Sequence, residues 1–191
     1  MGRLLPAALA VGLVLLAGCS GDDDPEPKIS PTDSSSVAST PTPSPTPSGP
    51  VEPTLPAEAE GEDAAAAEAF VRFYWEMVNY AEATGEVEGL AALALQTCVA
   101  CEGGSADIKR IYEAGGSVSG GEIKVRGTKS APFESGPSRG FAVTVDVTIA
   151  PQVVKVPGEK VQRYSGGPNQ FRFIVQRDSG VWLVGRWDPT S

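Results

Sequence analysis

Apolar side chains recur at helical spacing where the folded part of the chain begins. They fall three or four positions apart, which is typical of one face of an α-helix. The stripe consists of Phe70, Phe73, Tyr74, Met77, Val78 and Ala81. Alanine-rich residues 64–69 extend this helix backward and Thr84-Gly85 ends it. Charged residues lie off the stripe, and we expect Glu76 and Glu82 among them to face water.

Two shorter helices are predicted next. Residues 87–96 would place Leu90, Leu93 and Ala94 toward the core, and residues 105–113 would place Ile108, Ile111 and Tyr112 on one side. Gly115-Gly116 stops the second of these helices. Cys98 and Cys101 therefore lie between the two predicted helices.

Beyond Gly116 the apolar positions alternate with polar ones, as in half-buried strands. Alternation is clearest in residues 141–149, where five apolar residues would face the core and the residues between them would face water. Further strands are predicted within residues 122–126, 152–164, 171–177 and 181–187. Asp178-Ser179-Gly180 predicts a tight hairpin. Helices followed by strands indicate an α+β domain, with one long and two shorter helices on an antiparallel sheet of about four to six strands.

The first 18 residues have the three parts of an export signal: a basic start at Arg3, an apolar run from Leu4 to Ala17, and small residues before Cys19. The run of about 14 residues is shorter than the roughly 20 that cross a bilayer as a helix. Leu16-Ala17-Gly18-Cys19 resembles the lipobox of bacterial lipoproteins. The resemblance implies cleavage before Cys19 and a diacylglyceryl anchor on it, which would hold the protein on the extracytoplasmic face of the cell membrane. The alternative is an ordinary secretory signal with a chance cysteine.

Residues 19–56 are rich in proline, serine and threonine and contain almost nothing apolar. Such a segment buries too little surface to offset its ordering entropy, so we predict a disordered stalk. The composition leaves open whether its threonines are glycosylated. The remaining residues, 57–191, suit one compact domain.

Composition excludes several kinds of chemistry. The chain has no histidine, which removes Ser-His-Asp triads, Cys-His pairs and histidine metal ligands. Its formal net charge of −9 at pH 7 argues against binding nucleic acid, and loss of Arg3 with the leader would make the charge more negative. Two cysteines cannot supply the four ligands of a structural zinc site. The acidic run at residues 22–24 lacks an ordered frame. We therefore predict no metal, no cofactor and no identifiable catalytic residue.

Cys98 and Cys101 remain as a pair once Cys19 is acylated, and an oxidising compartment favours a disulfide between them. The alternative is a redox-active Cys-x-x-Cys pair, which in thioredoxin-type proteins begins a helix that follows a strand. Here the pair follows a predicted helix and precedes Gly103-Gly104, with no βαβ pattern nearby. This context favours a structural disulfide.

A pocket site has two sets of candidate residues. Asp146 is the acid within a predicted strand, and a ketosteroid-isomerase-like enzyme would need such a carboxylate in an apolar pocket. However, Thr144 and Thr148 share its side of the strand, which favours a solvent-facing position. The second set is aromatic and either lines a ligand pocket or packs in the core. It consists of Tyr74, Trp75, Tyr80, Trp182 and Trp187.

The chain resembles a family of actinobacterial lipoproteins of unknown function over most of residues 54–191. The resemblance rests on the order of short motifs after the lipobox and the stalk: Phe70-Val71-Arg72-Phe73-Tyr74-Trp75, Cys98-Val99-Ala100-Cys101, Ile111-Tyr112-Glu113-Ala114-Gly115-Gly116 and a terminal strand containing Trp182. That family is similar to nuclear-transport-factor-2-like proteins, which implies a curved sheet around a long first helix, often enclosing a pocket. Such proteins include isomerases, dehydratases, polyketide cyclases and binding modules, so the fold does not settle the function.

Three functions remain open from the sequence. The favoured one is a lipid-anchored module that binds an envelope protein or component or a small ligand. The second is a small isomerase or hydrolase that uses Asp146, which requires this residue to be buried beside an apolar cavity. The third is a structural role in the cell envelope, for which a large exposed apolar patch would be the sign.

Overall fold

The computed structural model describes residues 49–136 and 138–190. The export signal, Cys19 and the predicted stalk up to residue 48 lie outside the described residues. The described part is an α+β domain with three α-helices and two antiparallel sheets, which confirms the predicted fold class. Within this part, no helix combines the length and the apolar character needed to cross a bilayer.

The long first helix forms as its apolar stripe predicts. A short 3-10 turn, η1 (Ala57–Ala59), precedes helix α1 (Ala64–Thr84). The carboxylate of Asp63 caps α1 by accepting a hydrogen bond of 2.9 Å from the backbone N–H of Ala66. Gly85, with φ of 83°, ends the helix in the left-handed conformation.

The other two helices differ from their predicted bounds. Helix α2 (Glu88–Ala92) is much shorter than expected, because the backbone of the next residues bonds to a strand instead. Leu93 accepts from the N–H of Val184 at 2.8 Å, and the N–H of Leu95 donates to the carbonyl of Val184 at 2.9 Å. Helix α3 (Val99–Glu113) begins six positions before the predicted start, directly after Cys98, and includes both Gly103 and Gly104.

The larger sheet has four strands in the order β2-β3-β6-β7. Their bounds are β2 (Ile123–Ser135), β3 (Ser138–Ile149), β6 (Gly167–Asp178) and β7 (Val181–Pro189). Along β3, Val143, Val145 and Val147 are buried and Asp146 is exposed, as predicted, whereas Ala142, which was predicted to face water, is buried. The predicted hairpin joins β6 to β7 through Ser179 and Gly180, which both have positive φ.

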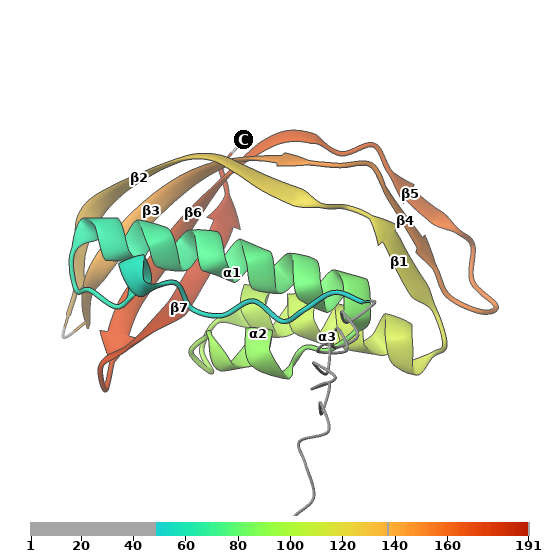
Figure 1. Ribbon diagram of the computed structural model, residues 1–191, viewed down its shortest axis with the longest axis horizontal. Helices are drawn as coiled ribbons and strands as arrows, with labels where there is room; N and C mark the ends of the chain where they lie inside the picture. The colour runs from blue at the N-terminus through green and yellow to red at the C-terminus, as the bar shows by residue number, and fades with distance from the viewer. Residues whose placement is uncertain (1–48, 137, 191) are drawn as a thin grey trace, which may run out of the picture. The chain divides into compact units, whose positions relative to one another are not determined.

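A second sheet of three short strands, in the order β1-β4-β5, continues the first beyond a bend. Its strands are β1 (Ser117–Gly120), β4 (Gln152–Lys155) and β5 (Gln162–Tyr164). The breaks between β1 and β2, β3 and β4, and β5 and β6 fall at Gly121, Pro151 and Gly166. A side chain at Gly166 would place a Cβ 2.4 Å from the carbonyl oxygen of Ile149, so the close approach of the strands requires glycine there. In Figure 1 the small sheet turns from the plane of the larger one toward α3.

The main core lies between α1 and the four-stranded sheet (Figure 1). Its largest fully buried side chains are Phe70, Phe173, Val71, Val143, Val145, Val147, Val175, Val184 and Cys98. A separate small cluster of Ile111, Val154 and Val156 joins α3 to the small sheet. The domain therefore has two clusters of buried apolar side chains, a large one against the four-stranded sheet and a small one against the three-stranded sheet.

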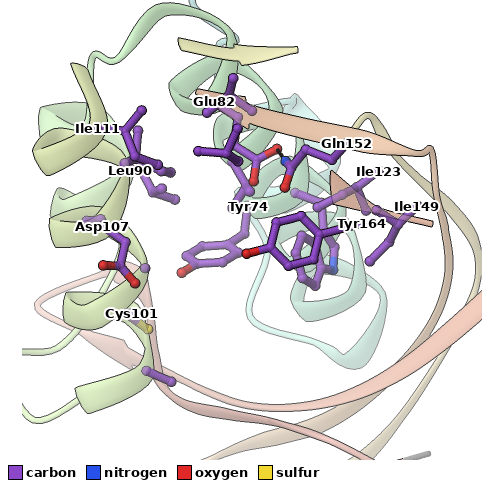
Figure 2. A pocket seen from close by; sticks show the side chains of 18 of the residues that line it. Tyr74, Glu82, Leu90, Cys101, Asp107, Ile111, Ile123, Ile149, Gln152 and Tyr164 are labelled. Carbon is purple, nitrogen blue, oxygen red and sulfur yellow. Dashed lines mark hydrogen bonds between the residues drawn. The ribbon is translucent and has the colours of Figure 1, made fainter. Parts of the chain in front are cut away.

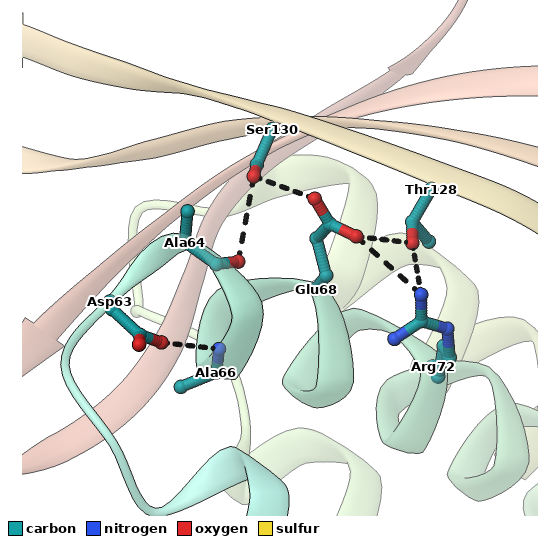
Figure 3. Close-up of polar contacts among 7 residues, drawn as sticks. All are labelled: Asp63, Ala64, Ala66, Glu68, Arg72, Thr128 and Ser130. Atoms are coloured by element: carbon teal, nitrogen blue, oxygen red, sulfur yellow. Dashed lines mark hydrogen bonds and ion pairs between the residues drawn. The ribbon is translucent and has the colours of Figure 1, made fainter.

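Polar contacts join the first half of α1 to β2 (Figure 3). The carboxylate of Glu68 accepts hydrogen bonds from the hydroxyls of Thr128 at 2.6 Å and Ser130 at 2.7 Å. Arg72 also pairs with Glu68 and donates to Thr128. The hydrogen bond from Thr128, followed by that from Ser130, lowers the pKa of Glu68 despite its partial burial.

Candidate functional site

A cavity of about 370 Å³ lies between the C-terminal half of α1, helix α3 and parts of both sheets. This volume falls within the roughly 300–1,000 Å³ typical of small-molecule sites. Most of the wall is apolar, with polar groups at a few places. Its apolar aliphatic residues include Val78, Leu90, Ile108, Ile111, Val118, Ile123, Ile149 and Val154. Figure 2 shows α1, α3 and the small sheet contributing side chains around this space.

Four aromatic residues form one side of the cavity, here called the aromatic wall: Tyr74, Trp75, Phe171 and Trp187. The ring centres of Trp75 and Phe171 are 5.1 Å apart, and those of Phe171 and Trp187 are 5.5 Å apart. Such distances are typical of aromatic pairs that contribute beyond their buried area. The rings hold one another in place, so this wall is formed before any ligand binds.

Polar atoms in the aromatic wall are poorly satisfied. Burial raises the pKa of the Tyr74 hydroxyl to about 12. The indole N–H of Trp187 faces the Tyr74 hydroxyl and partly opposes this rise in pKa, but the two groups are not in hydrogen-bond geometry. Within the described residues, the indole N–H groups of Trp75 and Trp187 are both buried without a hydrogen-bond partner. An unpaired buried donor costs free energy, and both N–H groups are shielded from solvent, so this cost belongs to the packing of the two rings against the core.

Glu82 and Gln152 lie elsewhere on the cavity wall (Figure 2). The Gln152 amide Nε2 donates a hydrogen bond of 2.9 Å to one Glu82 carboxylate oxygen. Burial raises the pKa of Glu82, and the bond from Gln152 partly opposes this rise. The Tyr112 hydroxyl donates to the backbone carbonyl of Glu82 at 2.6 Å and so fixes the last turn of α1.

The expectation that Glu82 faces water is wrong, because this side chain is half-buried and lines the cavity. The spacing of residues along α1 already indicated that Glu82 lies on the cavity side. Glu82 follows Val78 by four residues and Tyr74 by eight, so all three share one face of α1. Gln152 had no comparable signal, since only the fold brings β4 to the end of a helix 70 positions earlier in the chain.

The structure brings together three of the six pocket candidates. Tyr74 and Trp75 from α1 and Trp187 from β7 line the cavity. Trp182 packs instead in the core, where it stacks on Phe70 and donates its indole N–H to the carbonyl of Gly61 at 3.0 Å.

The other two candidates also lie away from the cavity. The Tyr80 hydroxyl donates to the carboxylate of Glu86 beyond the end of α1. Asp146 is exposed on the opposite face of β3 and accepts a hydrogen bond of 2.8 Å from the Gln170 amide. The cavity therefore receives no carboxylate from a strand, and its half-buried one comes from the first helix.

Cys98 and Cys101 form a disulfide, as predicted. However, they begin α3, whereas the sequence placed them before a helix that starts at Ser105. The Cys98 sulfur accepts a hydrogen bond from the Cys101 N–H at 3.3 Å, at the helix N-cap. Both sulfur-bearing residues are buried, which keeps them from partner thiols and agrees with a structural disulfide. Cys101 also lines the cavity, so the bond holds part of its α3 wall.

Metal ligands do not gather anywhere in residues 49–136 and 138–190, where no three His, Cys, Asp or Glu side chains are placed to hold an ion.

The chain matches the model of a family of unknown function, DUF6318, over residues 44–187. It belongs to this family. No curated protein matches the chain. The match covers nearly all of the described domain, including α1, α3 and all but the last two residues of the sheets that surround the cavity.

Two solved structures are weakly similar to this DUF6318 chain. The intermembrane space region of the chloroplast protein ARC6 is 11% identical, covers 66% of this chain and 95% of that one, and gives a TM-score of 0.44. The β subunit of benzoate 1,2-dioxygenase from Burkholderia mallei is 9% identical, covers 68% of this chain and 90% of that one, and gives a TM-score of 0.44. Similarity at this level supports no inference about function.

Proposed function

We propose that this chain is an extracytoplasmic, lipid-anchored module that binds a small, largely apolar molecule in the cavity beside α1. The observation that carries the proposal is the cavity itself, with its aromatic wall and one half-buried carboxylate. Apolar walls with a few polar groups and a perturbed pKa are the usual marks of a ligand site.

The anchor is supported by the sequence. Leu16-Ala17-Gly18-Cys19 at the end of a short apolar run is the pattern of a lipoprotein signal, and the proline-rich stalk would separate the domain from the membrane. Cys19→Ser should release the protein from the membrane fraction while leaving the far-UV circular dichroism of the domain unchanged. Continued membrane attachment of this variant would contradict the proposed anchor.

The shape of the domain agrees with the proposed relation to nuclear-transport-factor-2-like proteins, since a long first helix packs against a bent antiparallel sheet. Binding is favoured over the two alternatives. The enzyme hypothesis required Asp146 beside the cavity, but this residue is exposed on another face. The large exposed apolar residues among those described come from separate segments of the chain, which gives little support to a structural interface.

A blocked cavity provides the direct test. Val78 lines the cavity from α1, so Val78→Phe should fill part of it. Val181→Phe is the matched control, because Val181 is exposed on β7 and lies outside the cavity. The probe is N-phenyl-1-naphthylamine, a neutral apolar dye whose fluorescence rises on binding.

We expect saturable dye binding to the chain from residue 19 onward, made with Cys19→Ser so that it carries no lipid. Val78→Phe should weaken this binding at least about tenfold, whereas Val181→Phe should leave it within about twofold. Circular dichroism of each variant checks that the fold is retained. The proposal fails if the parent chain shows no saturable binding, or if the two valine variants bind the dye equally well.

A further inference from the structure

We infer that the cavity selects amphipathic ligands with a cationic head, such as a primary ammonium group, which would bind at Glu82 while the apolar body contacts the aromatic wall. This inference rests on the proposed function and adds the chemical class of the ligand.

The two ends of such a ligand have separate places in the cavity. Glu82 follows Tyr74 by eight residues on α1, which corresponds to about 12 Å along a helix axis. The aromatic wall therefore lies about two helical turns from the carboxylate. Figure 2 shows Glu82 and Gln152 together at one side of the space, with the Tyr74 and Tyr164 rings projecting into it.

The carboxylate of Glu82 has no cationic partner among the described residues. Within the described residues, no lysine or arginine forms an ion pair with its carboxylate, and the Gln152 amide is the one side-chain donor to it. One carboxylate oxygen therefore accepts from Gln152, and the other has no donor from these residues. A half-buried carboxylate without a counter-charge costs free energy, and a bound cation would reduce this cost.

The basic residues nearest to the cavity do not form ion pairs with Glu82. Arg110 lines the cavity from α3, but it pairs with Asp107 at 3.7 Å and with Glu159 at 3.6 Å. Arg163 of β5 and Glu122, just before β2, each line a neighbouring depression that also reaches Glu82. Arg163 is exposed and makes no ion pair with Glu82. Among the residues that line the cavity, Glu82 and Asp107 are acidic and Arg110 is basic, and acidic residues also outnumber basic ones in the whole chain.

The aromatic wall suits the other end of the ligand, because tryptophan and tyrosine rings accept an apolar body without requiring hydrogen bonds. The preference for a cation therefore comes from Glu82. A neutral alcohol of the same length could donate to Glu82 but would leave its charge uncompensated, and a carboxylate ligand would be repelled.

The test uses three probes with the same alkyl chain: octylammonium, octanol and octanoate. Each competes with N-phenyl-1-naphthylamine for the chain from residue 19 onward carrying Cys19→Ser, at pH 8. The variants are Glu82→Gln and, as a matched control, Glu76→Gln. Glu76 lies on the same helix but is exposed and does not line the cavity.

Octylammonium should bind about tenfold more tightly than octanol, and octanoate should bind most weakly. Glu82→Gln should remove this tenfold advantage and change octanol binding by less than about twofold, while Glu76→Gln should leave the order intact. Equal binding of the three probes, or an ammonium advantage that survives Glu82→Gln, would overturn the cation inference and leave the proposed function standing. Failure of the dye and all three probes to bind would overturn both.

Discussion

Gly85 and Gly115 allow a matched test of the packing at the end of α1. Both glycines follow a helix and have positive φ, 83° and 72° respectively. Their surroundings differ. A Cβ at Gly85 would lie 2.5 Å from Cγ of Tyr112, whereas a Cβ at Gly115 would meet nothing within 4 Å. Alanine should therefore destabilise the domain much more at Gly85 than at Gly115.

The two costs can be worked out separately. The left-handed conformation costs an alanine about 1–2 kcal/mol, and the stiffer unfolded chain returns about 0.4–1 kcal/mol, so Gly115→Ala should lose about 1 kcal/mol. Gly85→Ala adds a steric collision of about 1–3 kcal/mol. The Tyr112 ring cannot move away freely, because its hydroxyl bonds to the carbonyl of Glu82 at 2.6 Å. The expected total for Gly85→Ala is about 3 kcal/mol.

Urea unfolding followed by tryptophan fluorescence measures both losses. A third comparison isolates the collision: with Tyr112→Ala already present, adding Gly85→Ala should cost only about 1 kcal/mol, as at Gly115. The packing argument is refuted if the two glycine variants are equally stable, or if Gly85→Ala costs the same with and without the Tyr112 ring.

Three further predictions concern the free energy of unfolding. Burial raises the pKa of Glu82, so ionising this group in the folded state lowers the free energy of unfolding once the pH is above the ordinary glutamate range. Glu82→Gln should therefore stabilise the domain at pH 7, and this stabilisation should vanish in acid, where the carboxyl group is neutral in both states. The pKa of Glu68 is lowered by its hydrogen bonds, so its contribution is present at neutral pH and lost as pH falls through the lowered value; Glu68→Gln should flatten the acid side of the stability profile. Reducing the Cys98–Cys101 bond should cost about 2 kcal/mol in urea unfolding, since its loop is short. Parallel pH-dependent unfolding of the parent chain checks the first two, and an unchanged unfolding midpoint after reduction would contradict the third.

The elements that formed as predicted are those whose signal is local. The apolar stripe specified α1, the alternation specified β3, and the turn residues specified the last hairpin. Helix α2 ends early because the backbone groups of Leu93 and Leu95 hydrogen-bond to Val184 of the edge strand β7. No sequence pattern near these two residues indicates that they would pair with a strand more than 80 positions later. The division into two sheets was missed for the same reason, since it depends on three breaks that align only after the strands pair.

The candidate site was predictable in part. Tyr74, Trp75 and Trp187 were proposed from residue type and do line the cavity, yet the same reasoning also proposed Trp182, which is core. A pattern of aromatic residues cannot distinguish these cases, because both bury one face of the ring. Glu82 lies beside the stripe, on the same face of α1 as Tyr74 and Val78, but a carboxylate was assumed to prefer water.

The bend between the two sheets divides the cavity wall between parts of unequal structural importance. Tyr74 and Trp75 belong to the main core and Trp187 packs against it, so changing them would disturb the fold itself. Val118, Gln152 and Val154 belong to the small sheet, whose own apolar contact with α3 is much smaller. Under the proposed function, substitutions in the small sheet should change which ligand the cavity prefers while costing the domain little stability.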